Sequence, residues 1–322
     1  MGSKVGETLR NIALVGHSHD GKTTLAEAML LIGGAIGRQG STDQGTTVLD
    51  FTPEEQRRHL SVDLGIGHCT FEGHRFTLLD TPGFGDFSGQ VATGLLAADA
   101  ALLVVSPTPE IEVGTETAWA ALAQDRLPRL VVVNKMDREN ADYWGAIDAL
   151  RERLQPRPVA LHLPIGTEAD FHGVVDLMHG KAFVSGSGPE ADCVEAPIPE
   201  EMVALVEERE EQLVEAAAEG DDELLEKYLE TGTLTEEEVE RGLREGIVAG
   251  RVCPVVCCSA TKLLGVRTLL RAISDLLPGP EVEAEGPPGA YCFATTADPF
   301  VGRVSYLRCS RARCGPTRRS TT

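Results

Sequence analysis

The stretch GHSHDGKTT, residues 16–24, lies between an apolar run and a helical pattern, and its spacing could hold a phosphate. From Gly16 to Thr23 it fits G-x-x-x-x-G-K-[ST] in the strand-then-helix context that this motif requires. Its glycines let backbone N–H groups converge on phosphate oxygens, Lys22 is placed to bridge the terminal phosphates, and the Thr23 hydroxyl is placed to ligate Mg²⁺. The predicted phosphate loop comprises Gly16, His17, Ser18, His19, Asp20, Gly21, Lys22, Thr23 and Thr24, of which His17, His19 and Asp20 have a simpler interpretation as loop spacers.

A second motif, Asp80-Thr81-Pro82-Gly83, ends another apolar run. An aspartate at a strand end can hold a magnesium-bound water, and the Gly83 N–H can meet a terminal phosphate, as magnesium-dependent phosphoryl transfer requires. Alone, this spacing is also typical of a turn capped by Asp and Gly. Its distance along the chain from the phosphate loop favours the functional interpretation.

A third motif, NKMD at residues 134–137, predicts which base is bound. The Asp137 carboxylate can accept hydrogen bonds from N1–H and the exocyclic amine of guanine, whereas adenine would leave that buried charge unpaired. The Lys135 stem can pack over the base, and Asn134 can tie loops together. After the last apolar run, Ser259 precedes an Ala260 amide that can meet the guanine oxygen. In this order the motifs predict a site for GTP or GDP with Mg²⁺.

Five apolar runs are predicted to be the buried strands that carry these loops: residues 11–15, 75–80, 100–105, 129–135 and 255–260. Helical patterns between most of them favour an α/β fold with a doubly wound, mostly parallel sheet. Ligands of such sheets bind at the carboxyl ends of the strands, where the three motifs lie. The Glu72-Gly73 turn between two strand-like runs predicts one antiparallel hairpin.

Composition is typical of a globular cytoplasmic protein: 322 residues, 42% hydrophobic and 25% charged, with no apolar run long enough to span a bilayer. The eight cysteines form no CxxC pair and show no zinc-like spacing, so we expect reduced, mostly buried thiols. A net charge of −21 argues against general affinity for nucleic acid.

Most of the acidity lies in residues 195–245, which hold 19 acidic and four basic residues. We interpret this as a solvated helical face with an apolar stripe around Leu213, Val214, Leu224 and Leu225, rather than as a docking surface. The predicted domains are a GTP-binding domain at 1–155 and 252–278, an inserted acidic subdomain at 156–251, a Pro- and Gly-rich linker at 279–289, and a final segment at 290–322.

These motifs resemble those of the translational GTPases, most closely elongation factor G and its paralogues, from about Arg10 to Arg308. The stretch LDFTPEEQRRHLSV resembles the first switch of the family, and ADPFVGRVSYLR resembles the opening of its second-domain β-barrel. The resemblance implies a P-loop GTPase domain with an inserted α+β subdomain and the start of a barrel. It also implies a magnesium-dependent switch with Ser61 as a further metal-binding hydroxyl, GTP hydrolysis, and the ribosome as partner. We further expect a monomer that contacts no membrane and makes no sequence-specific contact with nucleic acid.

The chain departs from this family at three places near the phosphates. At the end of the first switch Ser61 stands where the family has a threonine, and it keeps a hydroxyl for Mg²⁺. The family's phosphate loop carries an aspartate, linked to a monovalent cation, where this chain has His19, and Asp20 lies one position late. The family's water-orienting histidine is Phe84 here, and a phenyl ring can neither donate a hydrogen bond to water nor accept one as imidazole does. With Lys22 and Gly83 kept as catalytic contacts, we expect a weak GTPase. The alternatives are a nucleotide-binding switch with negligible turnover and a non-functional fragment.

The final segment differs from the family after Arg308, where the sequence CSRARCGPTRRSTT takes the place of further barrel strands. We expect a C-terminally truncated barrel that is poorly ordered from about Tyr291, because a few strands cannot close a barrel. A shifted reading frame over residues 310–319 would restore a family-like segment, so we interpret the tail as a frameshift. The alternative is a natural basic tail.

Overall fold

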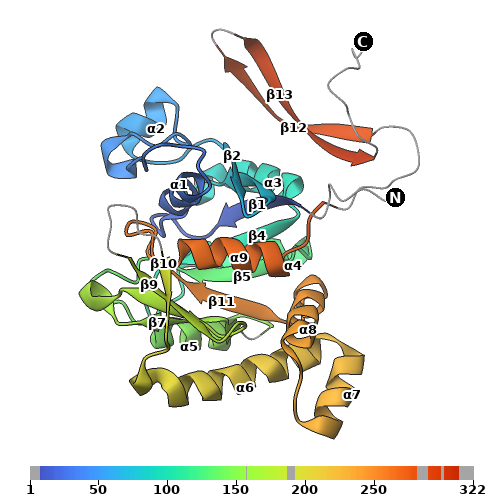
Figure 1. Ribbon diagram of the computed structural model, residues 1–322. Helices are drawn as coiled ribbons and strands as arrows, with labels where there is room; N and C mark the ends of the chain where they lie inside the picture. Colours follow the sequence, from blue (N-terminus) through green and yellow to red (C-terminus); the bar gives the residue numbers. More distant parts are fainter. Residues whose placement is uncertain (1–7, 157, 187–192, 281–288, 299–300, 312–322) are drawn as a thin grey trace.

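The computed structural model describes residues 8–156, 158–186, 193–280, 289–298 and 301–311. Its centre is a seven-stranded sheet in which all neighbours are parallel except β2 and β3. This arrangement confirms the predicted doubly wound sheet and the antiparallel hairpin (Figure 1). In sheet order the strands are β2 (Gly65–Phe71), β3 (His74–Asp80), β1 (Leu9–Val15), β4 (Ala100–Val105), β5 (Arg129–Val133), β11 (Cys253–Cys257) and β6 (Pro158–Ala160).

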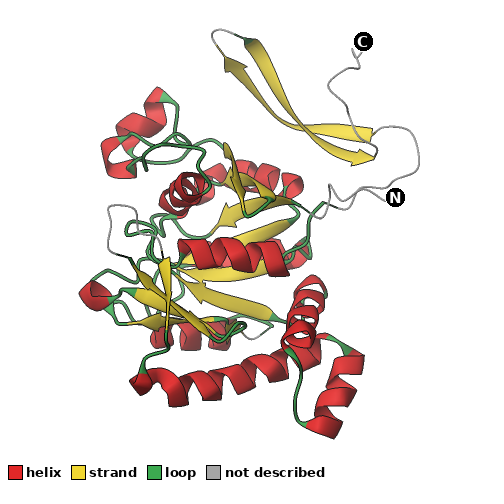
Figure 2. Cartoon of the chain, in the orientation of Figure 1, coloured by secondary structure: helices red, strands yellow, loops and turns green. Residues whose placement is uncertain are grey.

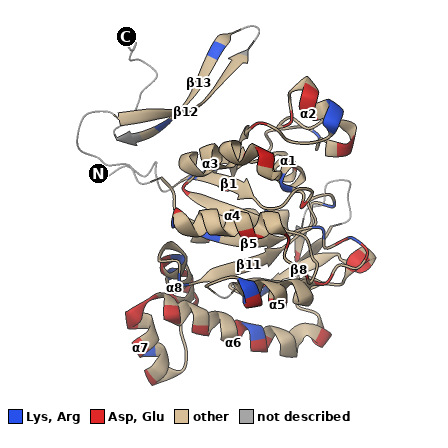
Figure 3. Cartoon of the chain, turned by 180° about the vertical axis from the view of Figure 1, so that it is seen from behind, with Lys and Arg blue, Asp and Glu red and all other residues tan. Residues whose placement is uncertain are grey.

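Helices cover both faces of this sheet, which is why its inner strands are continuous apolar runs rather than alternating ones. Every residue of β4 and β5 is buried. Two helices, α1 (Lys22–Ile32) and α9 (Val266–Leu276), lie together on one face. The opposite face is covered by α3 (Ser88–Ala97), α4 (Val113–Gln124) and α5 (Tyr143–Arg153) (Figure 3).

Two central strands end earlier than predicted, and their ends create the site loops. β5 stops at Val133 because the next residues leave the ladder: Lys135 has a left-handed backbone, with φ of 63°. β11 stops at Cys257, and Ser259 pairs instead with Leu264 in an isolated bridge. Both motifs therefore lie on loops at the carboxyl edge rather than within strands.

The inserted region contains a second, antiparallel sheet followed by three helices. The sheet comprises β7 (His162–Ile165), β8 (Gly173–Asp176), β9 (Lys181–Ser185) and β10 (Cys193–Ala196). The helices are α6 (Val203–Gly220), α7 (Asp222–Thr231) and α8 (Glu236–Val248). The strand β6 lies within 156–251, the range predicted for the inserted subdomain, but it pairs with β11 and extends the central sheet.

The acidic helices have a narrower apolar stripe than the sequence suggested. Leu213 and Leu224 are buried, at 1% and 2% exposed, whereas Leu225 is 37% exposed. In Figure 3 acidic positions of α6 and α7 follow the outer side of this region. The remaining short helices are α2 (Pro53–Arg58) and the 3₁₀ turns η1 (Thr42–Gln44), η2 (Gly85–Phe87), η3 (Glu168–Asp170) and η4 (Glu200–Met202).

The final described elements are β12 (Gly289–Asp298) and β13 (Gly302–Arg311), which pair as an antiparallel hairpin beside the central domain (Figure 2). Tyr291 donates through its hydroxyl to the Leu96 carbonyl, and Arg308 pairs with Asp99. The expected disorder from Tyr291 onward is therefore wrong for this hairpin, because its strands pair with each other and dock on α3. Most of the predicted linker and the basic tail, 281–288 and 312–322, lie outside the described residues.

No helix in the described parts of the chain combines the length and apolar character needed to cross a bilayer.

Candidate nucleotide-binding site

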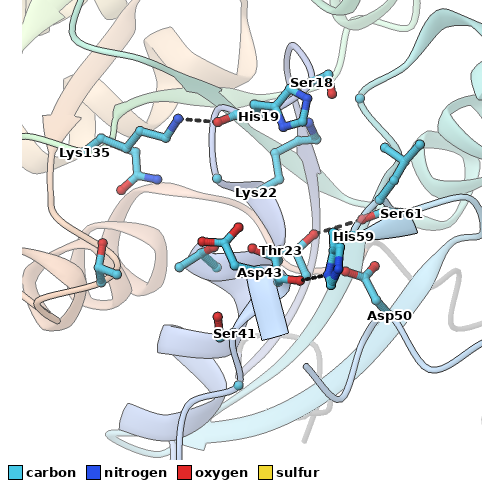
Figure 4. A pocket seen from close by; sticks show the side chains of 18 of the residues that line it. Ser18, His19, Lys22, Thr23, Ser41, Asp43, Asp50, His59, Ser61 and Lys135 are labelled. Atoms are coloured by element: carbon cyan, nitrogen blue, oxygen red, sulfur yellow. Dashed lines mark hydrogen bonds between the residues drawn. The ribbon is translucent and has the colours of Figure 1, made fainter. Parts of the chain in front are cut away.

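A cavity of about 610 Å³ opens at the carboxyl edge of the central sheet, between the predicted motifs and the loop that precedes α2 (Figure 4). The predicted residues that line it are Ser18, His19, Gly21, Lys22, Thr23, Thr24, Ser61, Gly83, Asn134 and Lys135. Residues that the sequence analysis did not assign complete the wall, namely Gln39, Gly40, Ser41, Thr42, Asp43, Asp50, Arg58, His59, Leu60, Arg138 and Thr261.

Asn134 joins three loops at the base of the cavity. Its Nδ2 donates to the carbonyl of Asp20 at 3.0 Å, and its Oδ1 accepts from the Ala260 amide at 3.1 Å. Gly21 has φ of 88°, and a Cβ there would lie 2.6 Å from Asn134 Nδ2. Only glycine combines that left-handed backbone with so close an approach. The phosphate loop and the two base loops are thereby held in one arrangement.

Lys22 and Gly83 meet where the terminal phosphates are expected. Lys22 Nζ donates to the carbonyl oxygens of Gly16 at 3.1 Å and His17 at 2.7 Å. A Cβ on Gly83 would lie 2.5 Å from that Nζ and 2.7 Å from the Ser18 backbone. Burial lowers the pKa of Lys22. A phosphate would give this ammonium a charged hydrogen-bond acceptor, since its present acceptors are neutral carbonyls.

The predicted metal corner combines hydroxyls with buried carboxyls. Thr23 Oγ1 lies 3.1 Å from Ser61 Oγ (Figure 4), and Asp80 is 1% exposed with its Oδ1 sealed from solvent and without a partner among the described residues. Burial raises the pKa of Asp80 to about 7. Asp50, which is also buried, accepts from Ser61, and burial raises its pKa too. Oxygen donors of this kind fit Mg²⁺, which keeps several waters and takes few protein ligands.

The loop after β5 contains a second carboxyl oxygen without a hydrogen-bond donor among the described residues, on Asp137, which lies next to the cavity but does not line it. Asp137 is half-buried, and its Oδ1 is sealed without a hydrogen-bond partner in the described chain. Lys135 extends its ammonium to the His19 carbonyl, across the mouth of the cavity (Figure 4). The Ala260 amide is bound to Asn134, so a guanine oxygen would share or replace that contact. Ser259 is fully buried, and its Oγ accepts from the Lys262 amide at 3.1 Å, which shapes the loop rather than the cavity.

Several predicted residues lie behind the cavity wall instead of on it. His17 turns away, and its Nδ1 accepts from the Gly114 amide at 3.2 Å. Asp20 is 1% exposed and accepts from the Ser106 hydroxyl at 2.7 Å, and burial raises its pKa to about 6. Thr81 donates to the Leu14 carbonyl at 2.7 Å. Further predicted residues that lie outside the lining are Gly16, Asp80, Pro82, Asp137, Ser259 and Ala260.

Phe84 stands at the edge of the phosphate corner, in the position where the resemblance expects a histidine. Its side chain is 38% exposed, and its ring meets that of His19 edge-on, with centroids 5.8 Å apart. His59, which lines the cavity and is an alternative for holding a water, has a left-handed backbone, and its Nδ1 is 2.9 Å from the Thr42 carbonyl oxygen. The Phe84 ring thus offers no polar atom to a water, and one ring nitrogen of His59 is already engaged by the loop.

Two wall residues were given no role in the sequence analysis, because no short spacing marks them. Asp50 lies in the stretch that resembles the first switch, but its burial beside Ser61 follows only from the folded loop. Gln39 lies in a glycine-rich stretch, yet its Nε2 donates to the Thr24 carbonyl at 3.1 Å and the Ala260 carbonyl at 3.0 Å. These contacts span up to 221 residues of sequence.

Comparison with known proteins agrees with this geometry. The model of the family described as the elongation factor Tu GTP binding domain matches residues 7–279. A crystal structure of a protein from Thermus thermophilus is similar over 95% of this chain, at 40% sequence identity and a TM-score of 0.87. The match covers 46% of the Thermus chain, so this chain spans less than half the length of that solved structure.

Proposed function

Because the chain belongs to the family of elongation factor Tu GTP-binding domains, we propose that it binds GTP and GDP with Mg²⁺ and hydrolyses GTP slowly. Membership makes it a translational GTPase of the elongation factor G type and implies guanine nucleotide binding in general. The observation that carries the finer proposal is the pair of sealed carboxyl oxygens, Asp80 Oδ1 and Asp137 Oδ1. Asp80 is the last residue of β3 and Asp137 lies on the loop after β5, and a metal-bound water or a guanine edge, respectively, would supply the missing donor.

Binding divides between the two ends of the cavity. At one end Lys22 and the backbone of the phosphate loop take the terminal phosphates, and Thr23, Ser61 and Asp80 would hold Mg²⁺, the last through water. Bound Mg²⁺ supplies charge that neutralises the phosphate oxygens. At the other end Asp137 accepts from the guanine edge while Asn134 keeps that loop on the phosphate loop.

Hydrolysis requires a water in line with the terminal phosphate. Lys22 and the Gly83 N–H are placed to stabilise charge that develops on the phosphate oxygens, which is the larger contribution to such reactions. Phe84 gives no hydrogen bond that would orient the water. We therefore propose a slow GTPase. The exposed, apolar character of Phe84 also favours the second candidate, a GTP/GDP switch with negligible turnover.

The ribosome is the proposed partner, on the strength of family membership alone. Because the Thermus relative is more than twice as long as the matched part, the action on the ribosome belongs to the proposal and not to the findings.

Nucleotide binding is tested with Lys22→Ala and a displacement titration. Lys22→Ala should abolish binding of fluorescent GDP, because the cavity loses the ammonium that faces Gly83. Lys181→Ala, an exposed lysine paired with Glu195 in the inserted sheet, is the matched control and should bind as the wild type does. Equal displacement by ATP and GTP would overturn the guanine assignment.

The base contact has its own test. Asp137→Asn should shift preference from guanine toward xanthine nucleotides, because an amide donates where the carboxylate only accepted. Asp125→Asn, at the exposed end of α4, serves as the control. An unchanged preference in Asp137→Asn would remove this residue from base recognition.

A further inference from the structure

A loop over residues 37–50 forms one wall of the nucleotide cavity. Ser41 and Asp43 line the cavity from this loop (Figure 4). The loop is closed at its neck, because a Cβ on Gly40 would lie 2.5 Å from the Cα of Thr47. The chain therefore enters and leaves this part of the wall at one point.

Glu27, in the middle of α1, holds that neck. Its side chain is 0% exposed, and each carboxylate oxygen accepts one backbone amide: Oε2 that of Gly40 at 3.0 Å, and Oε1 that of Val48 at 2.7 Å. A buried carboxylate is costly unless its oxygens are hydrogen-bonded, and bonds to a charged acceptor are strong. One side chain of a packed helix thus binds both ends of the loop.

We propose that Glu27 is a positioning residue that latches the loop 37–50 over the cavity and slows the release of nucleotide. The same helix begins with Lys22 and Thr23, which face the phosphate and metal corner, so phosphate contacts and latch share one rigid element. Gln39 adds a second tie, from the start of the loop to the Thr24 and Ala260 carbonyls. The identity of the nucleotide rests on the proposed function, whereas the latch is a property of the chain itself.

The carboxylate is needed because both loop groups are donors. A glutamine at position 27 has one acceptor oxygen and one NH₂ group, so its NH₂ would face either the Gly40 or the Val48 amide, donor against donor. One hydrogen bond to a charged acceptor is then lost. By the strength of such bonds, opening of the loop should become about tenfold more frequent.

The test is Glu27→Gln, examined by hydrogen exchange of amides 38–50 without nucleotide and by the dissociation rate of fluorescent GDP. Exchange in this segment should accelerate about tenfold, with the central strands unchanged, and GDP should leave about tenfold faster. Glu54→Gln is the matched control, because Glu54 lies in the same region and pairs with the exposed Arg57 and Arg58 instead of with the neck of the loop. Segment exchange and GDP dissociation within about twofold of wild type would overturn the latch.

A second variant keeps the test decisive if Glu27→Gln does not fold. Replacing Val48 by its α-hydroxy acid turns that amide into an ester and removes one donor without touching the buried carboxylate. Faster exchange in 38–50 supports the latch, and unchanged exchange overturns it. Failure of the wild type to bind GDP would refute the proposed function, while the exchange measurement without nucleotide would still decide the latch.

Discussion

The residues expected to bind the nucleotide are separate from Phe84, the residue expected to limit hydrolysis. The contacts expected to hold the nucleotide lie on Lys22, Asn134 and Asp137, and none of them involves the Phe84 ring, which meets only His19 among the described aromatic side chains. A change at Phe84 should therefore alter turnover while leaving affinity nearly constant, because the two properties depend on separate groups.

We expect Phe84→His to raise the single-turnover rate of GTP hydrolysis, since imidazole can orient the attacking water. The gain should be at least tenfold, as general positioning of water by a side chain commonly contributes about 10²-fold or more. The dissociation constant for GTP should stay within about threefold, less than 1 kcal/mol. The measurement is quench-flow hydrolysis with and without ribosomes, in a chain long enough to engage them.

Phe293→His, on the β12–β13 hairpin away from the cavity, controls for an added imidazole. A Phe84→His chain that binds nucleotide and ribosomes normally but hydrolyses at the original rate would show that another group orients the water or that chemistry is not limiting.

Site residues could be predicted from the sequence where they belong to a short motif with fixed spacing. The phosphate loop and the NKMD stretch each follow a strand and Asp80 ends one, and so their positions at one edge could be inferred. Glu27, Gln39 and Asp50 could not, because their partners are chosen by how the loop 37–50 folds back on α1. A buried glutamate in an apolar helix is a weak signal without the structure.

At the scale of elements, the central strands were predictable because burial on both faces makes them uniformly apolar. β6 was not, since three residues, Pro158–Ala160, give no periodicity, and only pairing with β11 assigns them to the sheet. The predicted ends of β5 and β11 lie two or three residues too far along the chain. The left-handed backbone at Lys135, which ends β5, cannot be inferred from an apolar pattern. Family membership confirms the fold class, and the domain boundaries remain predictions.

The inserted sheet carries an unusual buried histidine. His162 in β7 lies opposite Asp176 in β8, is 1% exposed, and has both ring nitrogens sealed without a partner within the described residues. Burial lowers its pKa. Asp176 accepts instead from His179, at 2.8 Å, and this hydrogen bond raises the pKa of His179. The two histidines therefore respond to pH in opposite directions.

Below the ordinary imidazole pKa of about 6.5, His162 binds a proton in the unfolded chain but stays neutral in the folded one. The free energy of unfolding therefore falls as the pH falls. The raised pKa of His179 has the opposite sign: its stabilisation is full below 6.5 and is lost as the pH rises through its folded value. We expect His162→Leu to remove the first effect and to flatten the loss of stability between about pH 6.5 and 5. It should also raise the free energy of unfolding at neutral pH by about 1 kcal/mol or more, since a sealed polar group is removed.

Urea unfolding at pH 5.5 and pH 7.5 measures both effects. His172→Leu, an exposed histidine in the same inserted region, should keep the acid slope of the wild type. An equally steep acid slope in His162→Leu would place the responsible group elsewhere.

At the scale of the whole molecule, a buried polar cluster joins the hairpin β12–β13 to the nucleotide domain, in addition to the Tyr291 hydrogen bond. Arg308 in β13 pairs with Asp99, whose side chain is 4% exposed, and donates to the Ala98 carbonyl at 2.5 Å. Asp99 also accepts from Nδ2 of Asn11, in β1, at 2.7 Å. Burial raises the pKa of Asp99, and the Arg308 charge opposes that shift. The hairpin thus contacts both the central sheet and the end of α3, the helix that follows the Asp80–Gly83 motif.

Removing the cation of this cluster should release the hairpin. In Arg308→Ala the Asp99 carboxylate would remain buried, with Asn11 as its one remaining donor among the described residues. Breaking a buried pair by removing one partner costs about 3–5 kcal/mol. If the hairpin undocks, water reaches Asp99 and this penalty is relieved. We therefore expect local opening of the hairpin and not unfolding of the whole domain. Hydrogen exchange should accelerate in β12, in β13 and at the end of α3, while β4 and β5 keep their protection.

Arg303→Ala, on the same strand and exposed, should leave the exchange of all these segments unchanged. Equal protection of the hairpin in Arg308→Ala and Arg303→Ala would mean that Tyr291 and apolar contacts hold it, and that the Asp99 cluster does not connect the hairpin to the nucleotide domain.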